Sequence, residues 1–271
     1  VGWVGGTVPN LTGHPNLIEL SMDDTCSGGL AVGFALAGRR PIFICRYQGF
    51  MHFNQAFFTN FAAKAREMWG YKVPVFIRAI AMEGSIGPVA SSSHHGMIIR
   101  MPGIQVCAPM TPGEYSHIWQ YFMSQDCPLY VSEHRKSFPV DCEMPDVIHR
   151  EADITLYPIS AARLNAIQAA EMLEKENVHC NIVHLIWLKP FVPDYRIIRP
   201  LINSEHGGLV IDTDFENGAS KCIAYDIMQK ADKKVCVMGL DERAAGFAPH
   251  LDNLPPSTEK IVQYVRKTLK K

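Results

Sequence analysis

The residues with the clearest chemical potential are an acidic pair and two aromatic residues that follow it. Asp23 and Asp24 precede a segment of small and apolar residues, and Tyr47 and Phe50 follow a short apolar run at 42–45. If the first segment is a helix and the second a strand, the start of the helix and the end of the strand can face one crevice. A flat, nitrogen-containing ligand suits such a crevice, because a carboxylate can bond a ring nitrogen while an aromatic ring stacks on it.

A histidine pair in a loop is the second candidate group. His94 and His95 belong to the sequence SSSHHG, in a segment at 82–95 that is rich in glycine and serine. Imidazole titrates near neutral pH, so either histidine could exchange a proton with a substrate or stabilise an oxyanion. The residues leave open which of the two has this role. Cys26 is predicted to be a small packed residue and not a nucleophile.

The helix that would follow the acidic pair has an unusual composition. Residues 25–37 include three glycines, Gly28, Gly29 and Gly33. Each glycine weakens a helix by about 1 kcal/mol relative to alanine. We therefore expect these glycines to let another part of the chain, or a ligand, approach the helix closely.

Apolar periodicity predicts an α/β chain in which strands and helices alternate. We expect strands at 16–21, 42–45, 73–80, 104–108, 129–132, 154–157, 181–188, 209–213 and 235–240. We expect the main helices at 25–37, 54–69, 112–124, 161–175, 194–203, 219–230 and 257–270. This alternation predicts right-handed βαβ units and mainly parallel sheets covered by helices on both faces. The polar, proline-containing stretch 133–153 predicts a boundary between two three-layer α/β/α domains, at 1–140 and 150–271.

Composition and charge argue against several classes of protein. The formal net charge is −1, from 26 basic and 27 acidic residues, so we expect neither a nucleic-acid partner nor a membrane surface. The eight cysteines are dispersed and form no CxxC pair. They are typical of buried thiols in a reducing compartment, and we expect a cytoplasmic protein. The chain has no GxGxxG after its first strand, no GxxxxGK[ST], no GxSxG and no HExxH, so no metal ligands are predicted within it.

A series of sequence blocks, in order, resembles one known family. The blocks are ALAGRRPIF, NFAAKAREM, VPVFIRA, MPGIQVCAPMTPGE, PLYVSEH, LKPF and FAPHLDNLPPSTEKIVQYVRKTL. Together they resemble the beta subunit of the first component of 2-oxoacid dehydrogenases of the pyruvate and branched-chain types. They also resemble the C-terminal half of transketolase and of deoxyxylulose-phosphate synthase. The resemblance covers nearly the whole chain and implies a pyrimidine-binding domain, a transketolase C-terminal domain and thiamine diphosphate as cofactor.

The resemblance also implies roles for the candidate residues. In the family, a glutamate at the start of the glycine-rich helix hydrogen-bonds N1′ of the cofactor's aminopyrimidine. That position falls on Asp24, which is one methylene shorter, with Asp23 as the second choice; the alternative is that Asp24 only caps the helix. Tyr47 matches the aromatic residue that stacks on the pyrimidine, and Phe50 matches a second aromatic residue near it. His94 or His95 matches the histidine that contacts substrate or reaction intermediates.

The assembly and the reaction follow from the same resemblance. The family's diphosphate and Mg²⁺ are held by a GDG motif, which this chain lacks. The resemblance therefore implies an alpha-type partner chain that binds the diphosphate and supplies most of the Mg²⁺ ligands. The expected assembly is an α2β2 heterotetramer. The leading reaction is decarboxylation of a 2-oxo acid with acyl transfer, with a lipoyl carrier as one possible acceptor. Alternatives are ketol transfer from a ketose by a split transketolase, acyloin formation, and a non-catalytic scaffolding subunit.

Overall fold

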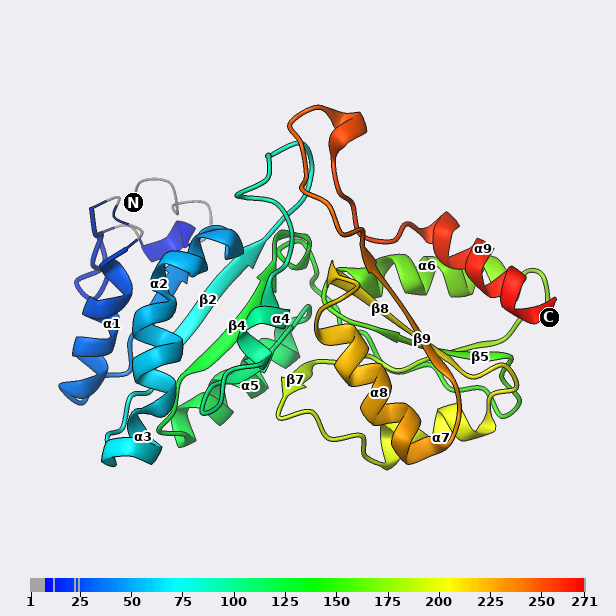
Figure 1. Cartoon of the computed structure of the whole chain (residues 1–271), viewed down its shortest axis with the longest axis horizontal. Helices are drawn as coiled ribbons and strands as arrows, with labels where there is room; N and C mark the ends of the chain where they lie inside the picture. The colour runs from blue at the N-terminus through cyan, green and yellow to red at the C-terminus, as the bar shows by residue number, and fades with distance from the viewer. Residues whose placement is uncertain (1–7, 12, 22, 24, 271) are drawn as a thin grey trace.

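The computed structural model describes residues 8–11, 13–21, 23 and 25–270. The strands of these residues form two sheets that lie side by side, each flanked by helices (Figure 1). Strand order is β1-β2-β4-β3-β7 in the first sheet and β6-β5-β8-β9 in the second. All pairs of neighbouring strands are parallel except β3 and β7. The predicted α/β class with mainly parallel sheets is confirmed.

The first sheet is built mainly from the N-terminal half of the chain. Its strands are β1 (Ile42–Cys45), β2 (Phe76–Ala81), β3 (Gln105–Cys107), β4 (Leu129–His134) and β7 (Trp187–Lys189). Its helices are α1 (Ser27–Leu36), α2 (Met51–Phe57), α3 (Ala63–Trp69), α4 (His95–Ile99) and α5 (Pro112–Ser124). A π-helical turn, Phe58–Ala62, connects α2 to α3.

Local sequence explains the sharp start of α5. The Thr111 side chain accepts a hydrogen bond from the backbone N–H of Glu114, and the Glu114 carboxylate accepts one from the backbone N–H of Thr111. This reciprocal capping box satisfies backbone donors that the first turn of a helix leaves unpaired. Pro112 at the first helical position adds a preset φ angle.

The second sheet is sandwiched between two pairs of helices. Its strands are β5 (Ile154–Pro158), β6 (Cys180–Ile182), β8 (Gly208–Phe215) and β9 (Val235–Leu240), and its helices are α6 (Ala162–Glu174), α7 (Tyr195–Asn203), α8 (Ala219–Ala231) and α9 (Thr258–Leu269). On one face, Leu156 of β5 belongs to a core cluster with side chains of α6 and α9. The next residue, Tyr157, belongs to the cluster that contains side chains of α7 and α8. Successive residues of a strand point to opposite faces, so both faces of this sheet are covered.

Two strand predictions were wrong. Residues 16–21 form a turn and an irregular segment, and Ile18 is 57% exposed there. A short apolar pattern forms a strand only when a sheet edge pairs with it. The predicted strand at 181–188 is split into β6 and β7, which belong to different sheets. The segment that connects β6 to β7 is also apolar, since Val183 and Leu185 are buried within it. Apolar periodicity therefore could not show where β6 ends and β7 begins.

The chain crosses between the sheets along the polar stretch after β4, where the sequence predicts a domain boundary. One hydrophobic cluster nevertheless contains side chains from both halves, including Ile98 of α4 and Ile223 of α8. The two halves are therefore packed against each other through α4 and α8. No helix within the described part of the chain is long and apolar enough to cross a membrane.

Candidate functional site

Tyr47, Phe50 and His94 follow strands of the first sheet at their carboxyl ends. Tyr47 follows β1, and the loop at 82–94 follows β2. Because β1 and β2 are parallel neighbours, these two connections leave the sheet at the same edge. In open parallel sheets, ligands bind in the crevice outside this edge. Asp24, the predicted pyrimidine ligand, lies outside the described residues.

Asp23 is engaged in a local turn ahead of α1. Its Oδ1 accepts hydrogen bonds from the backbone N–H of Thr25 at 2.9 Å and of Cys26 at 3.2 Å, and from the Thr25 hydroxyl at 2.7 Å. The bonds from Thr25 lower the pKa of Asp23. Asp23 is thus an ionised carboxylate that orders the entry to the helix.

Tyr47 and Phe50 form an aromatic pair. Their ring centroids lie 5.6 Å apart, at an interplanar angle of 74°. Both side chains are half-buried, and Phe50 also packs against the core. The guanidinium carbons of Arg46 and Arg135 lie 5.2 and 5.7 Å from the Tyr47 ring centroid. The pair therefore offers aromatic surface in an electropositive setting, since each arginine is attracted to the ring.

Gln48, which the sequence analysis missed, connects these aromatic residues to the histidine loop. It is fully buried, and its Nε2 donates to the Ala79 carbonyl at 3.0 Å and to Ser132 Oγ at 2.8 Å. Its Oε1 accepts from the backbone N–H of His94 at 2.6 Å. One amide side chain thereby joins strands β2 and β4 to the histidine loop. A lone glutamine between two aromatic residues gave no sequence signal of this role.

His94 is neutral and faces the aromatic side of the site. Its Nε2 lies 3.1 Å from the Ser91 carbonyl oxygen, which can only accept, so Nε2 carries the proton and Nδ1 the lone pair. Burial lowers the pKa of His94 to about 4; the bond to Ser91 opposes this shift and the nearby His52 favours it. The His94 ring lies 5.7 Å from that of His52 and 6.0 Å from that of Phe215. At neutral pH His94 is therefore an uncharged imidazole whose Nδ1 carries the lone pair.

His95 points the other way, into the contact between the two halves. It is fully buried; its Nδ1 lies 3.0 Å from Ser132 Oγ, and its Nε2 lies 3.1 Å from Asp212 Oδ1 and 3.8 Å from Asp214 Oδ2. Burial disfavours its charge, but Asp212 and Asp214 outweigh burial and raise the pKa of His95 to about 9. At neutral pH His94 is therefore uncharged and its neighbour His95 is positively charged. The bonds of His95 to Asp212 hold α4 against β8.

Further bonds clamp the histidine loop to β8. The hydroxyls of Ser93 and Thr213 lie 2.7 Å apart, and the backbone N–H of Gly96 donates to Asp214 Oδ2 at 2.6 Å. A Cβ on Gly96 would lie 2.8 Å from that same oxygen and 3.0 Å from the backbone nitrogen of Ala219. The position therefore requires glycine for close packing. His94 is held from both sides, by Gln48 of the first half and by β8 of the second.

A second buried pair lies at the same edge of the sheet. His134, at the end of β4, donates from Nε2 to the Glu83 carboxylate at 3.0 Å, and its Nδ1 accepts from the backbone N–H of Lys136 at 3.1 Å. Both side chains are nearly inaccessible to solvent, at 1% and 3% exposure. Neither residue was predicted, although each lies within two residues of the carboxyl end of a strand, which was a usable signal.

Two of the three glycines of α1 let another part of the chain approach the helix closely, as predicted. A Cβ on Gly28 would lie 2.5 Å from Asn54 Oδ1, and one on Gly29 would lie 2.8 Å from the Phe57 ring, so α2 approaches α1 closely. A Cβ on Gly33 would meet no described atom within 4 Å. Gly33 lies on an exposed face of the helix, next to Leu30 and Phe34.

Known proteins resemble the chain along nearly its whole length. A family model described as the transketolase pyrimidine-binding domain matches residues 16–140. The beta subunit of acetoin:2,6-dichlorophenolindophenol oxidoreductase from Cupriavidus necator is 27% identical, over 94% of this chain and 80% of that protein. The pyruvate dehydrogenase E1 component subunit beta from Rickettsia felis is also 27% identical, over 94% of this chain and 84% of that protein.

A solved structure shares the fold over both sheets. A split-gene transketolase, described as an inactive beta4 tetramer, aligns with a TM-score of 0.74 and 18% identity over 98% of this chain and 88% of that chain. The segment matched by the family model contains Tyr47, Phe50 and His94. Residues 16–140 therefore match the transketolase pyrimidine-binding domain, and the chain is similar along nearly its whole length to the beta subunits of acetoin oxidoreductase and of the pyruvate dehydrogenase E1 component.

Proposed function

We propose that this chain is the beta-type subunit of a two-chain, thiamine diphosphate-dependent enzyme that cleaves or forms a carbon–carbon bond beside a carbonyl group. Decarboxylation of a 2-oxo acid with transfer of the acyl unit is the leading reaction. The observation that carries the proposal is that Gln48, which lies between Tyr47 and Phe50 in the chain, binds the backbone of a neutral His94 at one edge of a parallel sheet. The beta subunits that resemble the chain over 94% of its length support the same reaction class.

The residues of this chain fit the aminopyrimidine half of the cofactor. The half-buried Tyr47 and Phe50 present aromatic surface on which a flat ring can stack. The predicted carboxylate, Asp24, precedes the first residue of α1 by three positions in the sequence. A carboxylate one methylene shorter than glutamate fits if the ring lies nearer to the start of the helix. When bound, the cofactor would supply the carbanion chemistry that a bond beside a carbonyl group requires.

His94 exchanges a proton with the substrate, and His95 holds His94 in position. His94 has the required properties: it is neutral, its Nδ1 lone pair is available, and Gln48 fixes its backbone. His95 contributes indirectly, because its bonds to Ser132 and Asp212 hold the first turn of α4. Arg46 and Arg135 beside Tyr47 suit an anionic substrate such as a 2-oxo acid.

An alpha-type partner chain would complete the site in an α2β2 assembly. The chain lacks the GDG motif of the family's diphosphate and Mg²⁺ site, so we propose that the partner binds both groups. An exposed apolar face on α1 supports association: Leu30 is 52% and Phe34 42% exposed, one turn apart, with Gly33 between them. A small residue there lets another helix approach closely. We further propose a cytoplasmic location and a lipoyl carrier as acyl acceptor.

Ketol transfer by a split transketolase is the second candidate reaction. The adjacent histidines in the loop after β2 favour it. The two reactions differ in substrate, because a transketolase consumes a ketose and needs no decarboxylation.

Reconstitution with an alpha-type chain tests the proposal. The two chains are co-expressed, loaded with thiamine diphosphate and Mg²⁺, and assayed with a panel of 2-oxo acids and with ketose phosphates. We expect cofactor binding and consumption of one 2-oxo acid, loss of turnover in Asp24→Ala, and retention of turnover in Asp24→Glu. Intact turnover in Asp24→Ala would show that another group contacts the pyrimidine. A pair that binds the cofactor but consumes no substrate would instead support the scaffolding role.

A further inference from the structure

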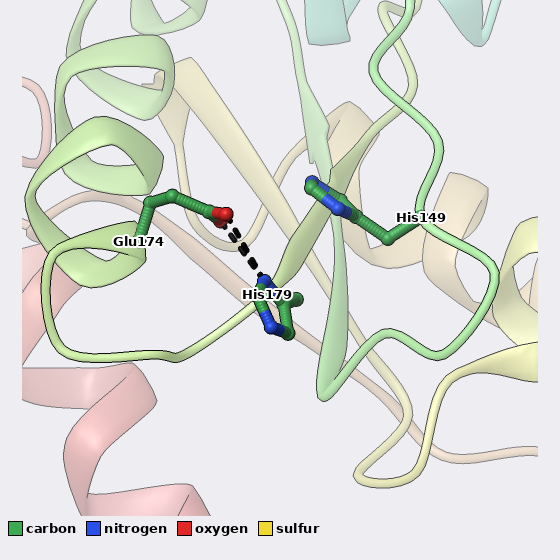
Figure 2. Close-up of side chains that lie close together, drawn as sticks. All are labelled: His149, Glu174 and His179. Atoms are coloured by element: carbon green, nitrogen blue, oxygen red, sulfur yellow. Dashed lines mark hydrogen bonds and ion pairs between the residues drawn. The ribbon is translucent and has the colours of Figure 1, made fainter.

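We propose that His149, Glu174 and His179 bind one divalent transition-metal ion of the zinc type. The three side chains converge from different segments (Figure 2): a loop before β5, the end of α6, and the turn that precedes β6. Each offers one ligand atom, and the three atoms lie within 4.8 Å of one another. No short motif marks this group, because its members are 25 and 5 residues apart in the chain.

A tight turn sets the distance between Glu174 and His179. The backbone N–H of Val178 donates to the Leu173 carbonyl at 3.1 Å, and that of Asn177 donates to the Glu174 carbonyl at 3.0 Å. These two bonds, with Asn177 at a φ of 58°, form the Schellman ending of α6. Glu174 and His179 thereby come close enough to pair, with His179 Nδ1 at 3.1 Å from Glu174 Oε2.

The backbones of both histidines are anchored to buried groups. The His149 N–H donates to Asn181 Oδ1 at 2.8 Å, and the His179 N–H donates to Asp153 Oδ2 at 2.7 Å. Asn181 is itself fully buried and donates to Thr155 Oγ1 at 3.1 Å. The two imidazole rings lie 5.3 Å apart, at an interplanar angle of 31°. The backbone positions of the two histidines are therefore set by the fold.

The donor set indicates the metal. Two imidazole nitrogens and one carboxylate oxygen suit Zn²⁺, Co²⁺, Ni²⁺ or Cu²⁺, whereas Mg²⁺ and Ca²⁺ prefer oxygen ligands. At metal–ligand distances of about 2.0–2.2 Å, tetrahedral ligands lie about 3.3–3.5 Å apart. The side chains of Glu174 and His179 are 50% and 42% exposed, so rotation about their side-chain bonds can close the remaining gap. Three protein ligands leave one position for water.

The alternative is a simple surface ion pair between Glu174 and His179. Such a pair does not involve His149, whereas the metal site requires it. A second group nearby, Asp153, Glu205 and His206, offers only one imidazole, and Asp153 is already used by the His179 backbone. Substituting His206 therefore tests whether a metal ion binds this second group instead of His149, Glu174 and His179.

A bound ion would join two connections at one edge of the second sheet. His149 precedes β5, while Glu174 and His179 flank the turn between α6 and β6. This edge is opposite to the end of β8 that contacts His95, because the strands are parallel. Since the unfolded chain lacks the site, metal binding should raise the melting temperature of the protein.

Calorimetric titration of the tag-free, metal-free chain with Zn²⁺ tests the site. We expect one equivalent to bind, with affinity reduced more than tenfold in His149→Asn, in His179→Asn and in Glu174→Gln. His117→Asn on α5, an exposed histidine outside both clusters, is the matched control and should bind like the wild type. Co²⁺ should give visible absorption bands typical of a low-coordinate site, and Zn²⁺ should raise the melting temperature only where the three ligands are intact.

Three results would overturn the proposal. The first is the absence of stoichiometric Zn²⁺ binding to the wild type. The second is wild-type affinity in His149→Asn, which would leave only the ion pair. The third is loss of binding in His206→Asn with retention in His149→Asn and His179→Asn, which would assign the ion to the neighbouring group. Melting curves of the metal-free variants verify that each one folds.

Discussion

At the scale of single residues, His94 and His95 show how the surroundings separate two identical side chains. His94 is held by Gln48 and stays neutral, whereas His95 is enclosed by Asp212 and Asp214 and is cationic. Only a neutral imidazole can accept a proton, and only a charged one can stabilise two nearby carboxylates. The two histidines therefore predict different consequences of mutation.

Replacing His94 should reduce turnover more than cofactor binding. We expect His94→Ala in the reconstituted enzyme to lower kcat by about 10²–10⁴-fold, the range for loss of a general acid–base group. Thiamine diphosphate affinity should change little, because Tyr47 and Phe50 remain. Steady-state kinetics and a separate cofactor titration measure the two effects, with His117→Ala as control. Wild-type kcat in His94→Ala would refute the role.

Replacing His95 should change how stability depends on pH. Its folded pKa of about 9 lies above the ordinary value of 6.5, so its contribution to stability is complete below pH 6.5 and is lost as pH rises through 9. The pKa of Asp214 is raised by burial to about 6, so that carboxyl affects a lower pH range.

The measurement is urea unfolding of the wild type and of His95→Gln between pH 6 and pH 10. The difference in unfolding free energy between them should shrink across this range, by a total on the order of 1–3 kcal/mol. A difference independent of pH would mean that His95 is uncharged in the folded protein.

At the scale of elements, the glycines of α1 can be separated by substitution. Gly28→Ala should destabilise the chain by about 1–3 kcal/mol, because the new methyl group would overlap Asn54. Gly33→Ala should stabilise the isolated chain by up to about 1 kcal/mol, because that position is open and alanine favours helix. Chemical denaturation of the two variants measures both effects, and equal changes would show that α1 and α2 are not in close contact.

Helices were more predictable from sequence than strands or site geometry. The helix at 112–124 was predicted from its apolar periodicity with the bounds that α5 has, and the capping box of Thr111 and Glu114 fixes its start in the structure. The split between β6 and β7 could not be predicted, since it depends on which sheet each strand joins. Tyr47 and Phe50 were placed together correctly, because a strand end leaves little freedom. The opposite environments of His94 and His95 come from β8, more than 100 residues away in the chain.

At the scale of the whole molecule, the exposed apolar face of α1 predicts where the partner binds. Phe34→Glu should weaken association with the alpha-type chain at least tenfold in Kd, which corresponds to about 1.4 kcal/mol. Met172→Glu on α6, where the side chain is 40% exposed, is the matched control and should leave the affinity unchanged. Analytical ultracentrifugation of the mixed chains measures the complex. Equal weakening by both substitutions would place the interface elsewhere.

The clamp on the histidine loop has a consequence for heat inactivation. His94 is supported by the first sheet through Gln48 and by the second through Ser93 and Gly96, so a slight separation of the two halves releases it while both sheets remain folded. On warming, catalysis should therefore fail several degrees before the circular dichroism signal melts. If the two midpoints coincide, the halves part only when the sheets themselves unfold. Otherwise, substitutions that strengthen the seam between the halves should extend the working temperature range of the enzyme without changing its melting temperature.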